Sequence, residues 1–459
     1  MEEQRYLIKS RTYLAGDPEL QDALAGVYDT PERPRCMCVR GGIEMYVAKH
    51  RLYVVKRMPE SGHQHHARCA SYEPELGQSG LGELIGESII EHSPESVELR
   101  VAFPLARVPG RAFVRRAAQE PAEINAARHR MSLRAVMHFL FQRAGFNRWY
   151  PAMEGKRTQG VIHRYLMEAA EGIRTKGVTL SERLYIPEQF HEQRRTEIAE
   201  RRRSKLAVLQ SPEDDVQFKM ALVIGEYKGE EASPLGRKVW LKHMPDAPLF
   251  IDAKAWERIE RAYGDLLDSR DADTKTKQRV VICALIYAKR EHIYQIDTAS
   301  FMLTSEHWIP IEGTHEVDLI EALTQQRRRF MKPLRYDARS AASFPNVLLL
   351  DTGAKPTPLH VVSASLGPQD RAAKEKALKA LGDTAWVWNT DRKMPPLPEA
   401  APLRTNERGE RAASSVMPPR GSSAPQEVLL GAGASAEAAL GHQHHQTGRG
   451  PVQYQDETD

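Results

Sequence analysis

Apolar and polar positions follow different rhythms in different parts of the chain. Apolar residues recur at helical spacing over residues 131–141, and a second helix is expected over about 158–170, after a loop-like stretch. Residues 43–50 and 51–57 are instead rich in β-branched and aromatic side chains and are joined tightly. This composition is typical of strands, so the two segments predict a β-hairpin.

The second half of the chain shows mainly strand patterns. Short apolar or alternating runs are separated by helical segments at 256–267, 318–330 and 371–381. The expected strands lie at residues 220–228, 237–243, 280–287, 293–304, 308–311, 344–350, 359–362 and 386–388. From about residue 395 the periodicity disappears and Pro, Ser, Gly and Ala dominate, which is typical of disorder.

These patterns predict an α+β protein in four parts. The first is a small module with a polar lead-in at residues 1–75, and the second is a mainly helical region at 76–206. A mixed α+β sheet domain follows at 207–395, and a disordered tail occupies 396–459. A length of 459 residues agrees with about two to four folded units.

The amino-acid composition excludes few classes of protein function. The apolar share is 41% and the charged share 27%, as in ordinary globular chains. A net charge of +4 gives no whole-molecule argument for nucleic acid or membrane, so local clusters must provide it. The acidic N-terminus shows no secretory leader, and no apolar run approaches the ~20 residues of a membrane span. We therefore expect a soluble, cytoplasmic protein with reduced cysteines.

Three of the four cysteines cluster near the N-terminus, together with several histidines. A pair of sulfurs precedes the predicted hairpin, and a histidine–cysteine pair follows it, which is a common arrangement for zinc. The candidate ligands are Cys36, Cys38, Cys69 and one of His63, His65 and His66. Four protein ligands leave no open position for water, so the site predicts structural zinc in a zinc-ribbon-like module.

Two other interpretations of the cysteines carry less weight. A redox pair of Cys36 and Cys38 would lack the usual two-residue spacer. The three cysteines could also be a chance grouping in a small reduced module. Cys283 lies in the apolar run of residues 280–288 and is expected in the core.

A carboxylate and a lysine at the end of one predicted strand suggest a nuclease. Glu226 and Lys228 follow an apolar run, and Asp214 lies upstream. A carboxylate that holds Mg²⁺ beside a lysine is the core of PD-(D/E)xK nucleases. The alternative is an ordinary solvated strand end. A second, weaker trace of such a site has Asn346 and His360 where acids would be needed, so that copy would be inactive.

Basic clusters provide the case for nucleic acid. Candidate phosphate contacts come from two runs, namely Arg201, Arg202 and Arg203, and Arg328, Arg329 and Lys332. The alternative is a solvated helix face balanced by acids such as Glu197 and Glu200. Neither a nucleophile elbow nor a phosphate-binding loop is present, and no small-molecule cofactor is expected.

Several of these segments together resemble a known family. They are residues 36–38, 45–47, 57–59, Gly62, His65 and 69–74, followed by 147–149, 222–228, 236–243, 308–312, 332–337 and 349–353. The sequence resembles a bacterial family of unknown function that has three N-terminal cysteines and occurs on plasmids and integrative conjugative elements. The resemblance favours His65 as the imidazole ligand, and it implies a mobile-element setting without any activity.

The leading hypothesis is therefore a zinc-containing accessory protein of a mobile element that contacts DNA or RNA. One alternative is a Mg²⁺-dependent nuclease that uses Glu226 and Lys228. The other is a protein-interaction scaffold in a conjugation complex, with mobile-element proteins as its partners.

Overall fold

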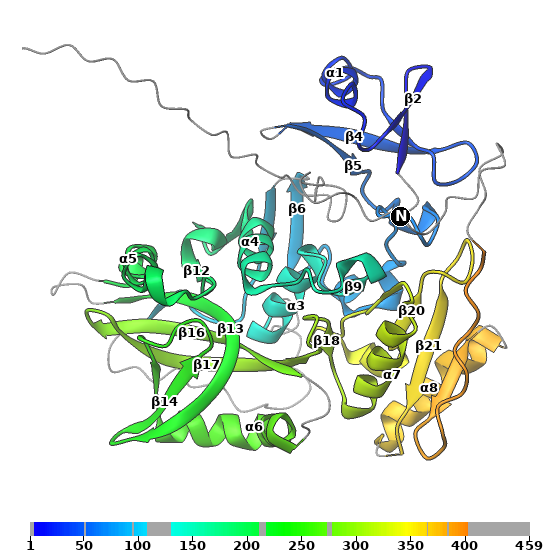
Figure 1. The fold of residues 1–459 in the computed structure, drawn as a ribbon. Helices are drawn as coiled ribbons and strands as arrows, with labels where there is room; N and C mark the ends of the chain where they lie inside the picture. The colour runs from blue at the N-terminus through cyan, green and yellow to red at the C-terminus, as the bar shows by residue number, and fades with distance from the viewer. Residues whose placement is uncertain are drawn as a thin grey trace, which may run out of the picture.

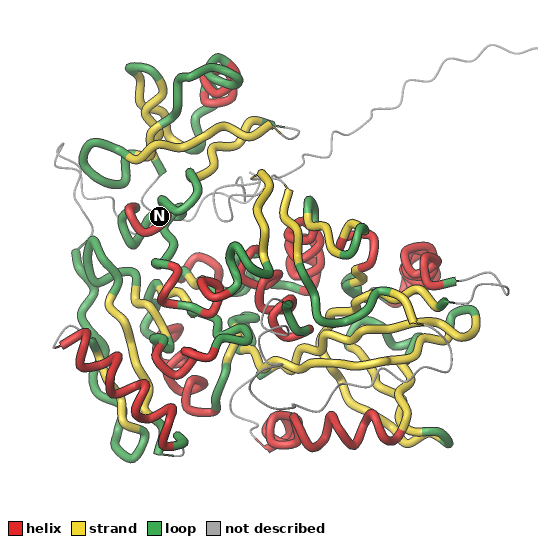
Figure 2. The backbone as a smooth tube through the Cα atoms, turned by 180° about the vertical axis from the view of Figure 1, so that it is seen from behind, coloured by secondary structure: helices red, strands yellow, loops and turns green. Residues whose placement is uncertain are grey.

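The computed structural model describes residues 4–49, 52–93, 96–107, 130–210, 217–272, 278–364, 366–382 and 385–402. These residues form an α+β protein, as the sequence predicts. In Figure 1 the N-terminal sheet lies above a barrel and a C-terminal sheet, and Figure 2 shows the same arrangement from behind.

The N-terminal sheet has the strand order β2-β1-β3-β4-β5. The predicted hairpin is confirmed, because Met45 pairs with Arg57 between two antiparallel strands. The lead-in that was expected to be polar also supplies strands and a helix, since Tyr6, Ile8 and Leu24 are buried there. The elements are β1 (Arg5–Ile8), β2 (Arg11–Leu14), α1 (Leu20–Ala25), β3 (Arg35–Cys36), β4 (Ile43–Lys49) and β5 (Tyr53–Arg57).

The helical region contains the two expected helices and a small sheet. Ser132 caps the first helix by accepting a hydrogen bond from the Ala135 N–H at 3.2 Å. The helices are α3 (Leu133–Arg143), α4 (Gln159–Ala170) and α5 (Arg195–Leu206), and the sheet consists of β6 (Ile89–Ser93), β7 (Ser96–Leu99), β10 (Ile173–Thr175) and β11 (Val178–Thr179).

Five strands of the third sheet close into a barrel. Their order is β13-β14-β15-β17-β16, and the last strand pairs again with the first. Closure is possible because β13 is long: its first half pairs with β16 and its second half with β14. The elements are β13 (Phe218–Ser233), β14 (Gly236–Leu241), β15 (Leu249–Asp252), α6 (Ala253–Ala272), β16 (Arg279–Arg290) and β17 (Ile293–Thr304).

The barrel's connectivity is that of the oligonucleotide/oligosaccharide-binding (OB) fold. In chain order the strands read 1-2-3-5-4-1, with helix α6 between the third and the fourth. The third and fifth strands, β15 and β17, are parallel, and every other neighbouring pair in the ring is antiparallel. Five strands in a Greek-key barrel define this fold.

The inside and outside of the barrel are covered differently. Alternate residues of each strand, such as Val223, Val239 and Ile282, face the interior. The outward residues of β13 and β16, such as Leu222 and Leu285, are buried in the same cluster as residues of α3 and α4. Three short strands attach to this sheet, namely β8 (Ala106–Arg107), β12 (Leu184–Tyr185) and β18 (Pro310–Ile311).

The C-terminal sheet has the order β22-β21-β20-β19-β9. Apart from the last strand it is built from one continuous stretch with the succession helix, three antiparallel strands, helix and a parallel strand. Its elements are α7 (Thr314–Gln325), β19 (Phe330–Met331), β20 (Val347–Leu349), β21 (Thr357–Val362), α8 (Pro368–Leu381) and β22 (Trp386–Asn389), and β9 (Arg148–Trp149) comes from the helical region.

The sheets cross the boundary expected near residue 206. Strands β8, β9 and β12 precede it, yet they pair with β13 and β19, which follow it. Residues 396–402, expected to open a disordered tail, lie against the C-terminal sheet, where the Ala401 N–H donates to the Asp351 carbonyl at 2.8 Å. The rest of the predicted tail, residues 403–459, is outside the described part of the chain.

Candidate metal centre

The four predicted ligands come together at one point. One ligand atom from each of Cys36, Cys38, His65 and Cys69 lies within 4.8 Å of the others. Of the three candidate histidines, His65 is the one in this cluster. His63 is exposed, and the His66 Nδ1 accepts a hydrogen bond from the Arg68 N–H at 3.2 Å.

Local structure places each ligand. Cys36 ends β3, and Cys38 lies in the turn that leads to β4. His65 follows the short 3-10 helix η1 (Gly62–Gln64), and Cys69 follows one more turn. Gly62 is required there, because a Cβ at this position would lie 2.7 Å from the Cβ of Glu73.

The distances match the edges of a zinc tetrahedron. Bond lengths of ~2.3 Å to sulfur and ~2.05 Å to nitrogen give edges of ~3.8 Å between two sulfurs and ~3.6 Å between sulfur and nitrogen. The sulfurs of Cys36 and Cys69 are 3.7 Å apart. The His65 Nδ1 lies 3.3 Å from the Cys38 sulfur and 3.6 Å from the Cys69 sulfur. The donor set therefore fits a metal ion such as zinc.

The closeness of the three sulfurs shifts the pKa values of Cys36 and Cys69 in opposite directions. Hydrogen bonds from Cys38 and Cys69 hold the pKa of the Cys36 thiol well below its ordinary value. The contact with Cys36 has the opposite effect on Cys69 and raises its pKa far above the ordinary value. The two opposite shifts belong to one coupled group, in which a first thiolate forms easily and further ones are opposed by its charge. A bound cation removes that opposition.

The metal loop also joins the N-terminal sheet to the C-terminal sheet. Cys36 and Cys69 pack with Met331, Leu348 and Leu350 of the C-terminal sheet. The Ala67 N–H donates to the Ala354 carbonyl at 3.0 Å, the Arg68 Nη2 to the Asp351 carbonyl at 2.9 Å and the Arg148 Nη1 to the Ala70 carbonyl at 3.1 Å. Ordering of this loop by a metal would therefore fix the contact between the two sheets.

The predicted nuclease residues do not form a common site with each other in the described structure. Both oxygens of the Glu226 carboxylate contact cations, the Lys242 Nζ at 3.1 Å and the Arg279 Nη1 at 2.8 Å. Lys228 is exposed and lies at a bulge in β13, where the register shifts between Tyr227 and Gly229. The bulge interrupts the alternation that would place Glu226 and Lys228 on one face. Asp214 lies outside the described residues.

Three of the six predicted phosphate contacts are buried in ion pairs. Arg202 pairs with Asp246 at 2.5 Å, and Arg328 grips both oxygens of Asp351 at 3.0 and 2.8 Å. The Lys332 side chain is 1% exposed and lies between Glu312 and Glu316. These three residues are not accessible to a phosphate, which corrects their predicted role.

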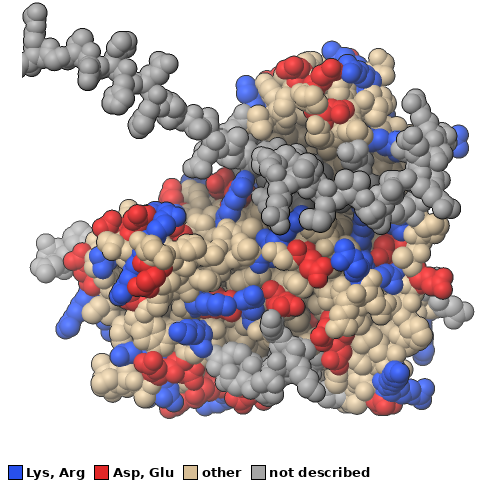
Figure 3. All heavy atoms as spheres, in the orientation of Figure 1, with Lys and Arg blue, Asp and Glu red and all other residues tan. Residues whose placement is uncertain are grey.

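The other three predicted contacts are accessible to solvent. Arg201 is exposed but already pairs with Glu188 at 2.7 Å, and Arg203 is exposed. Arg329 is half-buried, with its guanidinium 5.9 Å from the centre of the Tyr150 ring. In the view of Figure 3, basic and acidic side chains are interspersed and no large basic field is formed.

Two features of the structure were not predicted from the sequence. One is the pair of half-buried aromatic side chains Trp240 and Phe250 on the outside of the barrel. The other is the buried acidic pair Glu312 and Glu316 around Lys332. The alternation in residues 237–243 was visible, but only the closed barrel shows which of its sides is outside.

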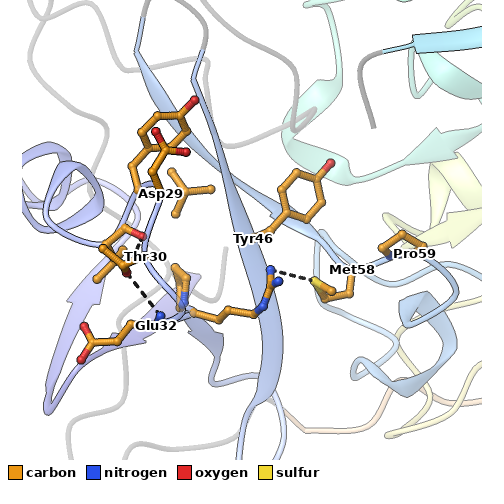
Figure 4. Close-up of a pocket in the computed structure, with 11 residues that line it drawn as sticks. Asp29, Thr30, Glu32, Tyr46, Met58 and Pro59 are labelled. Atoms are coloured by element: carbon orange, nitrogen blue, oxygen red, sulfur yellow. Dashed lines mark hydrogen bonds between the residues drawn. The ribbon is translucent and has the colours of Figure 1, made fainter. Parts of the chain in front are cut away.

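A hollow of about 330 Å³ lies between residues 27–34 and the hairpin of β4 and β5, as Figure 4 shows. Tyr46 and Met58 line it, and the Arg33 Nη1 lies 3.7 Å from the Met58 sulfur. Its lining contains no histidine or cysteine, so it adds no ligand to the metal cluster.

Comparison with known proteins gives a family and no activity. Residues 6–391 match the family described as "Protein of unknown function (DUF1173)". The chain belongs to this family. No curated protein and no solved structure matches it. Membership in DUF1173 agrees with the resemblance to a family of unknown function. Among the described residues, no helix is both long and apolar enough to cross a membrane.

Proposed function

We propose that this DUF1173 protein is a zinc-containing accessory protein that binds single-stranded nucleic acid on the outside of its barrel and does not cleave it. The observation that carries the proposal is the aromatic pair on β14 and β15, in a barrel with OB connectivity. In OB folds, the face of the second and third strands binds oligonucleotides, and aromatic side chains there stack on bases.

The strand register supports the orientation of the two aromatic residues. Val239 and Leu241 flank Trp240 and are buried in the barrel, so the Trp240 side chain points outward. Leu249 and Ile251 flank Phe250 in the same way. Lys238 pairs directly with Phe250 across the two strands. Trp240 lies two residues further along β14, so Trp240 and Phe250 are diagonal neighbours on the same face of the sheet.

The surroundings of the aromatic pair favour stacking over phosphate binding. Lys238 is opposite Glu231 in the register of β13 and β14, and Lys242 pairs with Glu226. Because both lysines face an acidic residue, we expect few phosphate contacts and a shallow salt dependence, with a slope of roughly −0.7 per phosphate contacted. Each stacked base would contribute about 1–3 kcal/mol.

The zinc ion has a structural role in this proposal. Three thiolates and one imidazole complete its coordination, so no ligand position remains for catalysis. The ion would order the loop that joins the two sheets. We further propose, on the resemblance described above, that the protein works in the cytoplasm in the setting of a mobile element.

Fluorescence anisotropy of the full-length protein tests the proposal. The probes are labelled 20-nucleotide DNA and RNA single strands and a matched duplex, at several salt concentrations. We expect single strands to bind more tightly than duplex. Trp240→Ala and Phe250→Ala should each weaken binding by about 5- to 150-fold, which corresponds to ~1–3 kcal/mol.

The matched controls are Leu52→Ala and Leu76→Ala, which remove exposed apolar side chains outside the barrel. Both should bind like the wild type. Absence of binding to every probe at 50 mM salt would refute the proposal and favour the protein-interaction scaffold. Unchanged binding by the variants of Trp240 and Phe250 would move the site away from the barrel.

A further inference from the structure

The stretch from α7 to β22 has the element succession of a metal-dependent nuclease core. PD-(D/E)xK nucleases place an acid before the second strand of such a unit and another in the third strand, and these acids hold a divalent cation. Here Asn346 comes directly before β20, and His360 lies in β21. The Asn346 N–H donates to the Leu359 carbonyl at 2.8 Å, and the Asn346 Oδ1 accepts from the Val361 N–H at 2.8 Å, so Asn346 lies beside the part of β21 that contains His360.

The remaining polar groups of this unit converge on the same place. The Asn346 Nδ2 donates to the Glu316 carboxylate of α7 at 2.7 Å. The Lys374 Nζ of α8 donates to the Asn346 Oδ1 at 3.1 Å and to the Phe344 carbonyl at 2.7 Å. His360 is fully buried, and neither of its ring nitrogens has a hydrogen-bond partner. Polar groups of this kind in a core require an explanation.

The Lys332 ammonium group lies where several oxygen atoms converge. The Lys332 Nζ is 3.1 Å from the Glu316 Oε1, 3.4 Å from the Glu312 Oε2 and 3.4 Å from the Pro333 carbonyl. The side chains of Lys332, Glu312 and Glu316 are 1%, 2% and 3% exposed. Two arginines also contact Glu312: the Arg335 Nε lies 2.7 Å from its Oε2 and the Arg134 Nη2 lies 3.9 Å from its Oε1. Carboxylate and carbonyl oxygens are the ligands that Mg²⁺ and Mn²⁺ prefer.

We propose that Lys332 occupies the place of the divalent cation in a nuclease-like unit, so that this unit holds together without metal and without cleaving. Charge balance supports this. Lys332 pairs with both buried carboxylates, whereas Arg335 and Arg134 contact Glu312 alone, so removal of the lysine leaves Glu316 without an ion-pair partner among the described residues. Asn346 and His360 supply no negative charge to attract a metal instead. The proposal goes beyond nucleic-acid binding by the barrel and does not depend on it.

The test is rescue by a divalent cation. Lys332→Ala removes the ammonium, and Asn346→Asp places a second carboxylate next to Glu316 while Lys332 remains. Without divalent metal, Lys332→Ala should melt well below the wild type, and Asn346→Asp should melt less far below it because the Lys374 Nζ lies 3.1 Å from the Asn346 Oδ1. We expect 5 mM MnCl₂ to raise their melting temperature by about 5 °C or more, because the ion binds only the folded form. Isothermal titration calorimetry should show one additional Mn²⁺ site per chain.

The controls are the wild type and Lys376→Ala, an exposed lysine on α8. Neither should be stabilised by Mn²⁺ and neither should gain a site, and both retain the N-terminal cysteine cluster, so metal binding there cancels in the comparison. Equal responses of wild type and variants would overturn the proposal. So would variants that fold without gaining Mn²⁺ binding, or that stay unfolded with and without Mn²⁺.

Discussion

The buried pair of Arg328 and Asp351 gives a quantitative test of how the C-terminal sheet is held together. The Arg328 guanidinium contacts both carboxylate oxygens, at 3.0 and 2.8 Å, and donates to the Pro398 carbonyl at 2.7 Å. Each side chain of the pair is 8% exposed. Arg328→Met would leave the carboxylate with the Arg329 N–H, 2.9 Å away, and with no cation in this pair.

Removal of one partner of a buried ion pair costs about 3–5 kcal/mol. With an m-value of ~3 kcal/mol per M of urea, the unfolding midpoint should fall by about 1–1.7 M. Arg329→Met is the matched control. It removes a half-buried arginine above a ring, a contact that contributes about 0.5–1 kcal/mol, so its midpoint should fall by roughly 0.3 M or less.

The assay is urea unfolding followed by tryptophan fluorescence, with nucleic-acid binding measured on the same samples. An Arg328 variant as stable as the Arg329 variant would refute the reasoning about burial. An Arg328 variant that keeps its stability but loses affinity for nucleic acid would instead support the phosphate contact that was predicted for Arg328 from the sequence.

Three further predictions concern the metal centre, the buried lysine and the nuclease alternative. Metal analysis should find about one zinc per chain, lost in Cys69→Ser and retained in Cys283→Ser; a stable wild type without metal would contradict the centre. Burial lowers the pKa of Lys374 in the folded protein to about 7, whereas its pKa in the unfolded chain is ~10.4. Between these two pH values the unfolded chain binds one more proton than the folded protein. The free energy of unfolding therefore rises with pH in this range, by up to ~1.4 kcal/mol per pH unit. Lys374→Met should flatten that rise in the unfolding free energy, and an unchanged pH slope would count against the burial argument. Plasmid and single-stranded DNA should stay intact with Mg²⁺ or Mn²⁺, and cleavage that disappears in Glu226→Ala would instead establish the nuclease.

The metal cluster could be predicted because its four ligands lie close together along the sequence. Cys36 and Cys38 share one turn, and the hairpin that follows returns the chain to His65 and Cys69. Spacing along the sequence therefore reports proximity in space. The choice among the neighbouring histidines was open from spacing alone, because three imidazoles lie within reach of one cysteine.

The basic clusters were interpreted wrongly because their acidic partners lie far away in the sequence. Arg328 forms an ion pair with Asp351, which lies 23 positions further along the sequence. Arg202 does the same with Asp246, which lies 44 positions further along. A run of arginines looks the same in sequence whether its charges meet phosphates or distant carboxylates. The bulge at Lys228 is equally hidden, since a single unpaired residue changes which side chains share a face.

The barrel was predicted as strands but not as a closed ring. Closure depends on β13 pairing with β16 through Met220–Glu226 and with β14 through Tyr227 and residues 229–233. The bend that divides the two halves leaves little trace in hydrophobic periodicity. Without closure, the alternation around Trp240 indicates a strand but does not say which side meets solvent.

The most direct test of the central claim is photo-cross-linking of the full-length protein to single-stranded DNA that contains 5-iodouracil, with the cross-linked peptide identified by mass spectrometry. Binding by the barrel predicts cross-links at Trp240 or Phe250, lost when an unlabelled single strand competes. Cross-links confined to Arg201 and Arg203 of α5, or none above the level seen with duplex, would contradict the account.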